Sequence, residues 1–139
     1  EAGFKYHMNN VNAVIGKAAF ADYGYVLGAH KSNGLYFDEL LLNVDGIKIP
    51  NYIEGSDNTY WLYTALVEKR EDFIRMMKSF GVDCAPLHRR NDLHEVFSSI
   101  KFDSKGLDEF YSSYIHWGCG PWVDVEAREK IVHLIKRGW

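Results

Sequence analysis

The chain has 139 residues, of which 47% are hydrophobic and 25% charged, which is the size and composition of one soluble globular domain. Its formal net charge of -3 gives it no general attraction for nucleic acid. No apolar run reaches the roughly 20 residues that cross a bilayer, and no charged-then-apolar leader begins the sequence. We therefore expect no nucleic-acid partner, no membrane partner and no export.

The first third of the chain predicts a helical arm. Residues 9–23 form a helix that Asn9 or Asn10 caps. Its apolar side chains recur at helical spacing: Val11, Val14, Ile15 and Ala18. Residues 26–43 predict a second helix, and its apolar stripe consists of Phe37, Leu40, Leu41 and Val44. Small and polar residues weaken the first half of that helix and predict a break there: Gly28, Ser32, Asn33 and Gly34.

The hydrophobic period changes after the arm. Ile47 and Ile49 alternate before Pro50 and predict a short edge strand, and residues 51–58 have the composition of a loop. Residues 59–67, TYWLYTALV, are apolar on both faces, which is typical of a central strand covered on both sides. Strand aromatics also stack bases in RNA-recognition modules, but the basic, glycine-containing motif of those modules is absent. We therefore favour a buried strand.

The rest of the chain alternates helices and strands. We expect a helix from Glu71 to Gly81, then a strand over 82–85 that Pro86 ends. A short helix capped by Asp92 follows, and after it a helix with the stripe Leu107, Phe110, Tyr111 and Tyr114. The chain closes with a strand over 115–119 and a helix that Asp124 caps and Gly138 ends. The fold class is α/β (α+β), with a mostly antiparallel sheet of three or four strands packed with helices. The expected division is a helical arm over 1–45 and a small α/β domain over 46–139.

Histidine and cysteine raise the question of a metal site or a nucleophile. Cys84, His88 and His94 share one segment, but zinc sites usually pair their ligands closely, and no second pair follows. We favour a loop with a solvent-facing histidine and expect no metal. A catalytic thiolate needs an activating base and an orienting group, and neither Cys84 nor Cys119 has such a signature, so both are expected in the core of a cytoplasmic protein. The sequence HRR over 88–90 suits an anion, although a solvated loop is the commoner reading.

Three segments together resemble the DegT/StrS type of pyridoxal-phosphate-dependent nucleotide-sugar aminotransferases. Residues 3–16, GFKYHMNNVNAVIG, resemble the glycine-aromatic segment of that family. Residues 60–88, YWLYTALVEKREDFIRMMKSFGVDCAPLH, resemble its strand–helix–strand unit and the Pro-Leu-His turn that follows. Residues 116–139, HWGCGPWVDVEAREKIVHLIKRGW, resemble its Cys-Gly-Trp-Trp and terminal-helix ending. The three occur in the family's order and spacing.

The resemblance implies a carboxy-terminal fragment of a fold-type I aminotransferase. The lysine that forms a Schiff base with the cofactor lies upstream in the family, and none of the ten lysines here sits in that motif. We therefore expect no catalytic residue, no activity and no bound cofactor in this chain alone. The parent enzyme is expected to use pyridoxal 5'-phosphate and to transfer an amino group, from glutamate, to a nucleotide-linked keto-deoxysugar for surface polysaccharide or glycoside biosynthesis.

The resemblance also implies site residues and a homodimer. In relatives the opening turn reaches across the dimer interface to the neighbour's cofactor phosphate, and the candidates here are Lys5, His7 and Asn9. Lys5 replaces a family-typical Asn, and His7 an Arg. His88 resembles the residue that faces the sugar-substrate cleft. Two alternatives remain: a free-standing ligand-binding module, and a structural or dimerisation domain descended from such enzymes.

Overall fold

The computed structural model describes residues 7–97, 99 and 103–139. Its helices are α1 (Asn10–Ala19), α2 (Tyr23–Leu41), α3 (Arg70–Ser79), α4 (Lys105–Ser113) and α5 (Val125–Lys136). Its strands are β1 (Ile47–Lys48), β2 (Tyr63–Val67), β3 (Cys84–Ala85) and β4 (Tyr114–Trp117). Short 3-10 turns are η1 (Phe20–Asp22), η2 (Asn91–Leu93) and η3 (Glu95–Phe97). The predicted α/β class is confirmed.

The strands form one small sheet in the order β1-β2-β4-β3, and every neighbouring pair is antiparallel. In the central pair, Tyr63 lies opposite Trp117 and Leu66 opposite Tyr114. Both edge strands, β1 and β3, contain two residues each. The sequence-based prediction of a central strand within TYWLYTALV is therefore confirmed, as is the predicted edge strand before Pro50.

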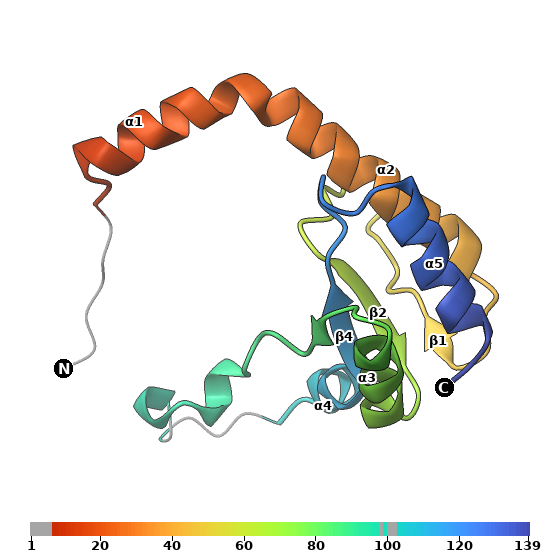
Figure 1. The fold of residues 1–139 in the computed structure, drawn as a ribbon. Coiled ribbons are helices and arrows are strands. Elements are labelled where there is room, and N and C mark those ends of the chain that lie inside the picture. The colour runs from red at the N-terminus through yellow and green to blue at the C-terminus, as the bar shows by residue number, and fades with distance from the viewer. Residues whose placement is uncertain (1–6, 98, 100–102) are drawn as a thin grey trace.

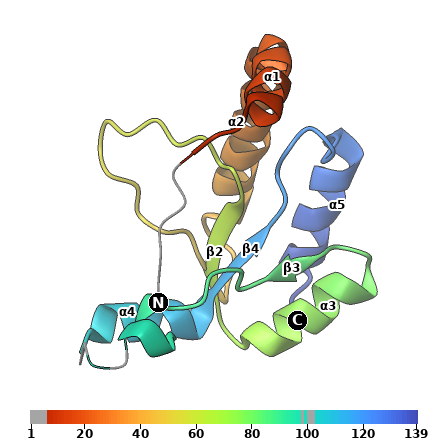
Figure 2. The ribbon, with the colours of Figure 1, turned by 90° about the vertical axis from the view of Figure 1, so that its left-hand side faces the viewer.

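One face of the sheet carries the hydrophobic core, and α2, α3 and α5 contribute to it. Because side chains alternate along a strand, the inward residues of β2 are Tyr63, Ala65 and Val67, and those of β4 are Ile115 and Trp117. The helices add the following side chains: Phe37, Leu41, Phe73, Met77, Ile131, Val132 and Ile135. The aromatic rings pack closely, with Tyr63 and Trp117 centroids 4.7 Å apart. Figure 2 shows α3 and α5 on one side of the strands and α4 on the other.

The opposite face is more polar and is covered at one end by α4. Phe110 of α4 stacks on Tyr114 with ring centroids 4.8 Å apart. Farther along the same face, Thr64 lies directly opposite His116, and their side chains are hydrogen-bonded at 2.9 Å. The sheet therefore separates an apolar core from a face that presents hydrogen-bonding groups.

The helical arm extends away from the sheet (Figure 1). No residue of α1 is buried, and the buried residues of α2 begin at His30. The predicted break within residues 28–34 is wrong, because α2 runs continuously from Tyr23 to Leu41 and the interruption falls at η1 instead. The boundary between arm and domain at residue 45 stays a prediction.

Tertiary contacts explain why the weak residues of α2 do not break it. The Nδ2 group of Asn33 donates to the carbonyl oxygens of Cys119 at 3.1 Å and Val123 at 2.8 Å. Gly34 lies under the ring of Tyr60, so close that an added Cβ would come within 2.1 Å of it. Both residues therefore serve packing between α2 and the domain, which a helix-propensity argument does not see.

Two other expectations are corrected. The predicted helix capped by Asp92 is replaced by the turns η2 and η3, because the Asp92 carboxylate binds Arg90 and does not cap. Tyr114 does not continue a helical stripe but opens β4. The caps at Asn9 and Asp124 are confirmed, since each side chain accepts a hydrogen bond from the backbone of the first helical turn. Across the described ranges, no helix is long and apolar enough to cross a membrane.

Candidate functional site

The residues predicted to bind ligands lie on two separate elements. His7 and Asn9 are exposed at the amino end of α1, whereas His88 is exposed in the turn that follows β3. Lys5, the third predicted contact, lies outside the described residues. The structure therefore gives surroundings for three of the four candidates.

The amino end of α1 has the chemistry that a phosphate needs. Asn9 caps the helix through Oδ1, which accepts from the Asn12 N–H at 2.8 Å. The first N–H groups of a helix have no acceptor within it, and the helix dipole is positive at this end. Asn9 also carries a side-chain amide and His7, two residues earlier, an imidazole, and both groups can donate hydrogen bonds. A phosphate group fits this donor set.

His88 lies within a row of rings on the polar face of the sheet. Its ring centroid is 6.1 Å from that of Trp61 and 5.6 Å from that of His116. The backbone carbonyl of His88 accepts a hydrogen bond from the Tyr114 hydroxyl at 2.5 Å, which ties the turn to β4. Trp61 is 67% exposed, so the row ends in a large aromatic surface open to solvent.

His116 is the buried member of this row. Burial and the neighbouring His88 lower the pKa of His116 below its usual value. Its Nδ1 is hydrogen-bonded to the Thr64 hydroxyl. The buried imidazole therefore favours the neutral form, in which it accepts or donates a hydrogen bond without carrying charge.

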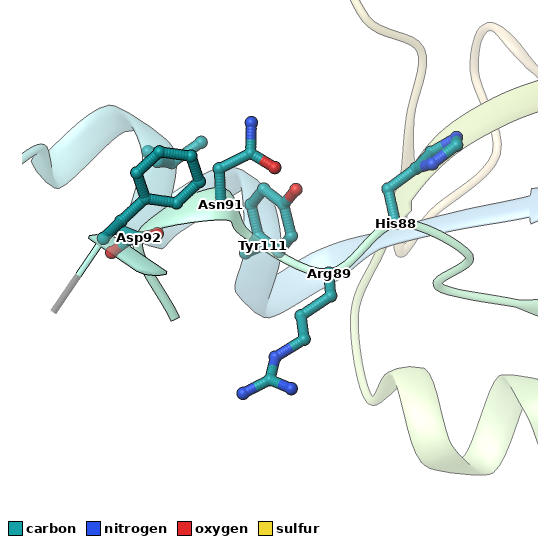
Figure 3. Close-up of a pocket in the computed structure, with 7 residues that line it drawn as sticks. His88, Arg89, Asn91, Asp92 and Tyr111 are labelled. Carbon is teal, nitrogen blue, oxygen red and sulfur yellow. The ribbon is translucent and has the colours of Figure 1, made fainter. Parts of the chain in front are cut away.

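An open pocket of about 580 Å³ begins at His88 and runs between the following turns and α4 (Figure 3). Its walls combine polar and aromatic groups: His88, Arg89, Asn91, Asp92, Phe97, Leu107 and Tyr111. The Arg89 guanidinium donates to the Leu93 carbonyl at 2.7 Å. In Figure 3 the Arg89 side chain points away from Asn91 and Tyr111, so it does not mark an anion site shared with them.

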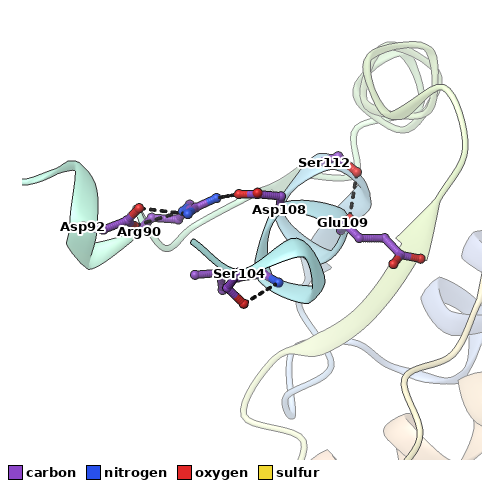
Figure 4. A network of polar contacts seen from close by, with 7 residues as sticks. Arg90, Asp92, Ser104, Asp108, Glu109 and Ser112 are labelled. Atoms are coloured by element: carbon purple, nitrogen blue, oxygen red, sulfur yellow. Dashed lines mark hydrogen bonds and ion pairs between the residues drawn. The ribbon is translucent and has the colours of Figure 1, made fainter. Parts of the chain in front are cut away.

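A charged cluster fixes one wall of the pocket (Figure 4). The guanidinium of Arg90 forms two hydrogen bonds with Asp92, at 2.9 and 2.8 Å, and pairs with Asp108 of α4. Hydrogen bonds to Asp92 and Asp108 raise the pKa of Arg90, and the same arginine lowers the pKa of Asp92. Ser104 caps α4 nearby by accepting from the Leu107 N–H. These groups are engaged with one another and serve to hold η2 against α4.

Sequence reasoning missed a cluster of three tyrosines around Asp38. The hydroxyls of Tyr52, Tyr60 and Tyr63 donate to its carboxylate at 3.2, 2.5 and 2.9 Å, respectively. Burial and the Asp38 charge raise the pKa of Tyr52 to about 12. These residues are spread over 26 positions and three elements of different type, so no local motif announces them.

Both cysteines are buried, as predicted. Burial raises the pKa of Cys84 to about 11 and that of Cys119 to about 12, which keeps both thiols protonated. Both cysteines are therefore buried side chains whose thiols are not activated. Among residues 7–97, 99 and 103–139, no group of three His, Cys, Asp or Glu side chains is placed to hold a metal ion.

Comparison with known proteins identifies relatives. The family described as the DegT/DnrJ/EryC1/StrS aminotransferase family matches residues 1–136. The structure is similar to sugar aminotransferase CalS13 from Micromonospora echinospora, with a TM-score of 0.91 and 26% identity over 99% of this chain and 37% of CalS13. It is similar to AtS13 from Actinomadura melliaura, with a TM-score of 0.90 and 29% identity over 100% of this chain and 37% of AtS13.

A more distant structure shares the fold, and all three of these structures are longer than this chain. DesV from S. venezuelae has a TM-score of 0.83 over 94% of this chain and 36% of DesV, but its 14% identity shows the fold alone. No curated protein matches the chain. The chain spans little more than a third of the length of the solved structures it resembles.

Proposed function

Because the chain belongs to the DegT/DnrJ/EryC1/StrS aminotransferase family, we propose that it is the carboxy-terminal part of a pyridoxal-phosphate-dependent sugar aminotransferase. The reaction is amino transfer, from glutamate, to a keto group on a nucleotide-linked deoxysugar. The family match over residues 1–136 carries this proposal. The similarity to the sugar aminotransferase CalS13 supports the sugar as the substrate class.

The cofactor, when bound, supplies the electron sink for amino transfer, and the protein supplies orientation and charge. The hydrogen-bond donors at the amino end of α1 support a contact with its phosphate group. We assign His7, Asn9 and Lys5 to that phosphate. The turn that carries them reaches the cofactor of a neighbouring subunit in a homodimer. The lysine that attaches the cofactor belongs to the preceding part of the longer protein, so the 139-residue chain alone is inactive.

His88 serves the substrate side of the site. It is exposed at the mouth of the open pocket, and its imidazole offers hydrogen-bonding nitrogens to sugar hydroxyls. The Tyr114 hydroxyl holds its carbonyl, and the Arg90 cluster holds the turns that follow. These groups orient the substrate, while the reacting atoms are handled elsewhere in the longer protein.

Amino transfer by the full-length protein tests the proposal. We expect the longer protein to show the absorbance of bound cofactor and to convert a nucleotide-linked keto-deoxysugar in the presence of glutamate, whereas the isolated chain does neither. Amino transfer by the isolated 139-residue chain would contradict its predicted inactivity. A full-length protein that binds no cofactor would overturn the whole assignment.

A substitution at Asn9 tests the phosphate contact. Asp caps a helix about as well as Asn, so Asn9→Asp preserves α1 while placing a negative charge beside the phosphate. We expect a lower cofactor affinity in a spectroscopic titration of the full-length protein, with unchanged helix content by circular dichroism. Asn9→Ser, which also caps but carries no charge, is the matched control. Equal cofactor affinities in all three proteins would remove Asn9 from the site.

A further inference from the structure

Tyr60 has an unusual backbone conformation. Its φ angle is 50°, in the left-handed region that bulky side chains rarely adopt. Such a conformation persists only where the surroundings hold it, and it often lies next to a functional group. The turn is not made by glycine, which would adopt it freely. The question is therefore what holds Tyr60 and what its conformation achieves.

Four hydrogen bonds hold this one residue. The carbonyl oxygen accepts from His30 Nδ1 at 2.8 Å and from the Cys119 thiol at 2.7 Å. The hydroxyl donates to Asp38 at 2.5 Å, and the backbone N–H donates to the Asn58 side chain at 3.1 Å. Because a carbonyl oxygen only accepts, the hydrogen of the His30 ring must be on Nδ1. Every polar group of Tyr60 is thus engaged.

The ring of Tyr60 is also enclosed. It lies over Gly34 of α2, where an added Cβ would come within 2.1 Å of the Tyr60 ring. It is also nearly parallel to the Tyr63 ring, with the two centroids 6.4 Å apart. Tyr60 is only 6% exposed, although it precedes the strand in an otherwise exposed loop. We call Tyr60 and its hydrogen-bonding partners His30, Asp38, Asn58 and Cys119, with Gly34, the Tyr60 clamp.

The clamp turns the next residue outward. Trp61 is 67% exposed, and its ring lies 6.1 Å from His88. In a regular strand, neighbouring side chains merely alternate between faces. Here Tyr60 adopts the left-handed conformation three residues before β2 begins at Tyr63, and the indole of the next residue lies beside the turn after β3. Two segments distant in sequence thereby meet at their exposed rings.

We propose that Tyr60 is a positioning residue that holds Trp61 beside His88, and that these two rings form a wall that packs against the sugar ring of the substrate. This inference rests on the proposed function. The apolar C–H face of a sugar packs against the flat indole, while the imidazole of His88 bonds its hydroxyls. The adjoining pocket, with Asn91 and Tyr111 among its lining residues, leaves room for the rest of the ligand.

The first experiment tests the positioning role on the 139-residue chain by NMR. Gly34→Ala favours the helix but displaces the Tyr60 ring, whereas Gly28→Ala lies in the same helix with nothing within 4 Å. Trp61→Ala defines the ring-proton shifts of His88 without the indole. We expect Gly34→Ala to move those shifts toward the Trp61→Ala values, and Gly28→Ala to leave them unchanged. A folded Gly34→Ala protein with unchanged His88 shifts would overturn the positioning role.

A gentler pair of variants covers the case in which Gly34→Ala does not fold. Tyr60→Phe and Tyr52→Phe each remove one hydroxyl that donates to Asp38, but only Tyr60 adjoins Trp61. We expect Tyr60→Phe to move the His88 shifts in the direction of Trp61→Ala, by a smaller amount, and Tyr52→Phe not to move them. Equal shifts from both variants would show a general loosening of the cluster and contradict the inference.

The second experiment tests the sugar contact in the full-length protein. We expect Trp61→Ala to raise KM for the nucleotide-linked keto sugar roughly three- to tenfold, the loss of one aromatic contact, with kcat and KM for glutamate nearly unchanged. Phe80→Ala, at the end of α3, removes another solvent-exposed aromatic ring and serves as the control.

The outcomes separate the two levels of the proposal. An active protein whose sugar KM is the same with and without Trp61 would refute the sugar contact and leave the proposed function standing. A parallel loss of kcat and of cofactor binding would show that Trp61 packs against the rest of the protein instead. A wild-type protein without aminotransferase activity would overturn the proposed function and the sugar contact together.

Discussion

Helices α1 and α5 share the same kind of cap and apolar stripe, but α5 is packed against the domain and α1 is exposed. Each is capped by an Asx side chain that accepts from the backbone three residues later at 2.8 Å. Each carries a stripe of β-branched side chains at helical spacing. In α5 that stripe is buried against the sheet and α2, and Ile135 is 0% exposed. In α1 no residue is buried, and Ile15 is 61% exposed.

The contrast shows what an amphipathic pattern specifies. A stripe of apolar residues states that a helix has a face to cover, but it does not state which molecule or segment covers it. For α5 the cover lies within this chain. For α1 the described residues of this chain supply no such cover, and the chain spans 37% of the length of CalS13. The stability of the two helices should therefore respond differently to equivalent substitutions.

The largest expected difference is between two isoleucine truncations. Ile135→Ala leaves a cavity in the core and should lower the free energy of unfolding by about 2–5 kcal/mol. Ile15→Ala removes an exposed side chain and should change it by less than about 0.5 kcal/mol. Urea denaturation of the 139-residue chain measures both. Comparable losses would mean that α1 packs against the domain in solution.

The caps give a second, smaller contrast. Asp124→Ala removes the acceptor for the Ala127 N–H and should cost about 1 kcal/mol of global stability. Asn9→Ala removes the equivalent acceptor in α1 and should fray that helix while leaving the urea midpoint unchanged. Circular dichroism at low urea, compared with the midpoint, separates local fraying from global unfolding. A shift of the midpoint in Asn9→Ala would break the comparison.

The pH dependence of the free energy of unfolding should come from His116 in the α/β domain and not from the helical arm. His116 has a lowered pKa, so the unfolded chain protonates it at a pH where the folded chain does not. Stability should be full above about pH 6.5 and fall as the pH drops from there toward the lowered pKa. His116→Gln should flatten this part of the profile, whereas His7→Gln should not. Identical profiles for both variants would assign the effect to other groups.

The smallest change in stability is expected at the ion pair that joins the helical arm to the α/β domain. Lys31 of α2 pairs with Asp57 of the following loop at 2.5 Å, and the Asp57 side chain is 81% exposed. Exposed pairs contribute about 0–1 kcal/mol, so Lys31→Ala should change the urea midpoint only slightly, and less at high salt. A loss as large as that of Asp124→Ala would show that this pair pins the loop to the helix.

Most elements of the fold follow from the sequence because they rest on local patterns. TYWLYTALV, apolar on both faces, predicted a central strand, and Asn9, Asp124, Gly81 and Gly138 predicted helix ends. The errors arose where a distant residue decides the local structure. Asn33 and Gly34 looked like helix breakers, but Asn33 donates a hydrogen bond to Val123 and Gly34 makes room for the Tyr60 ring.

The candidate site was predictable only in part, for the same reason. The resemblance pointed to His88, which is exposed and lines the pocket, and its contact with a ligand stays a prediction. Nothing in the sequence pointed to Trp61 as its neighbour, because the two are 27 positions apart and Trp61 follows a residue with a left-handed backbone, Tyr60. Asp92 shows the converse: its pairing with Arg90, two residues away, overrode a sound capping signal.

The shortness of the outer strands has a consequence for how the molecule behaves in a crowded solution. A long, flat edge strand offers unpaired backbone groups to other chains and seeds aggregation. Here β1 and β3 contain only two residues each, while the aromatic strands β2 and β4 pair with each other at the centre of the sheet. The aromatic segment TYWLYTALV therefore supplies a central strand, and neither outer strand offers a long edge to which another chain could add.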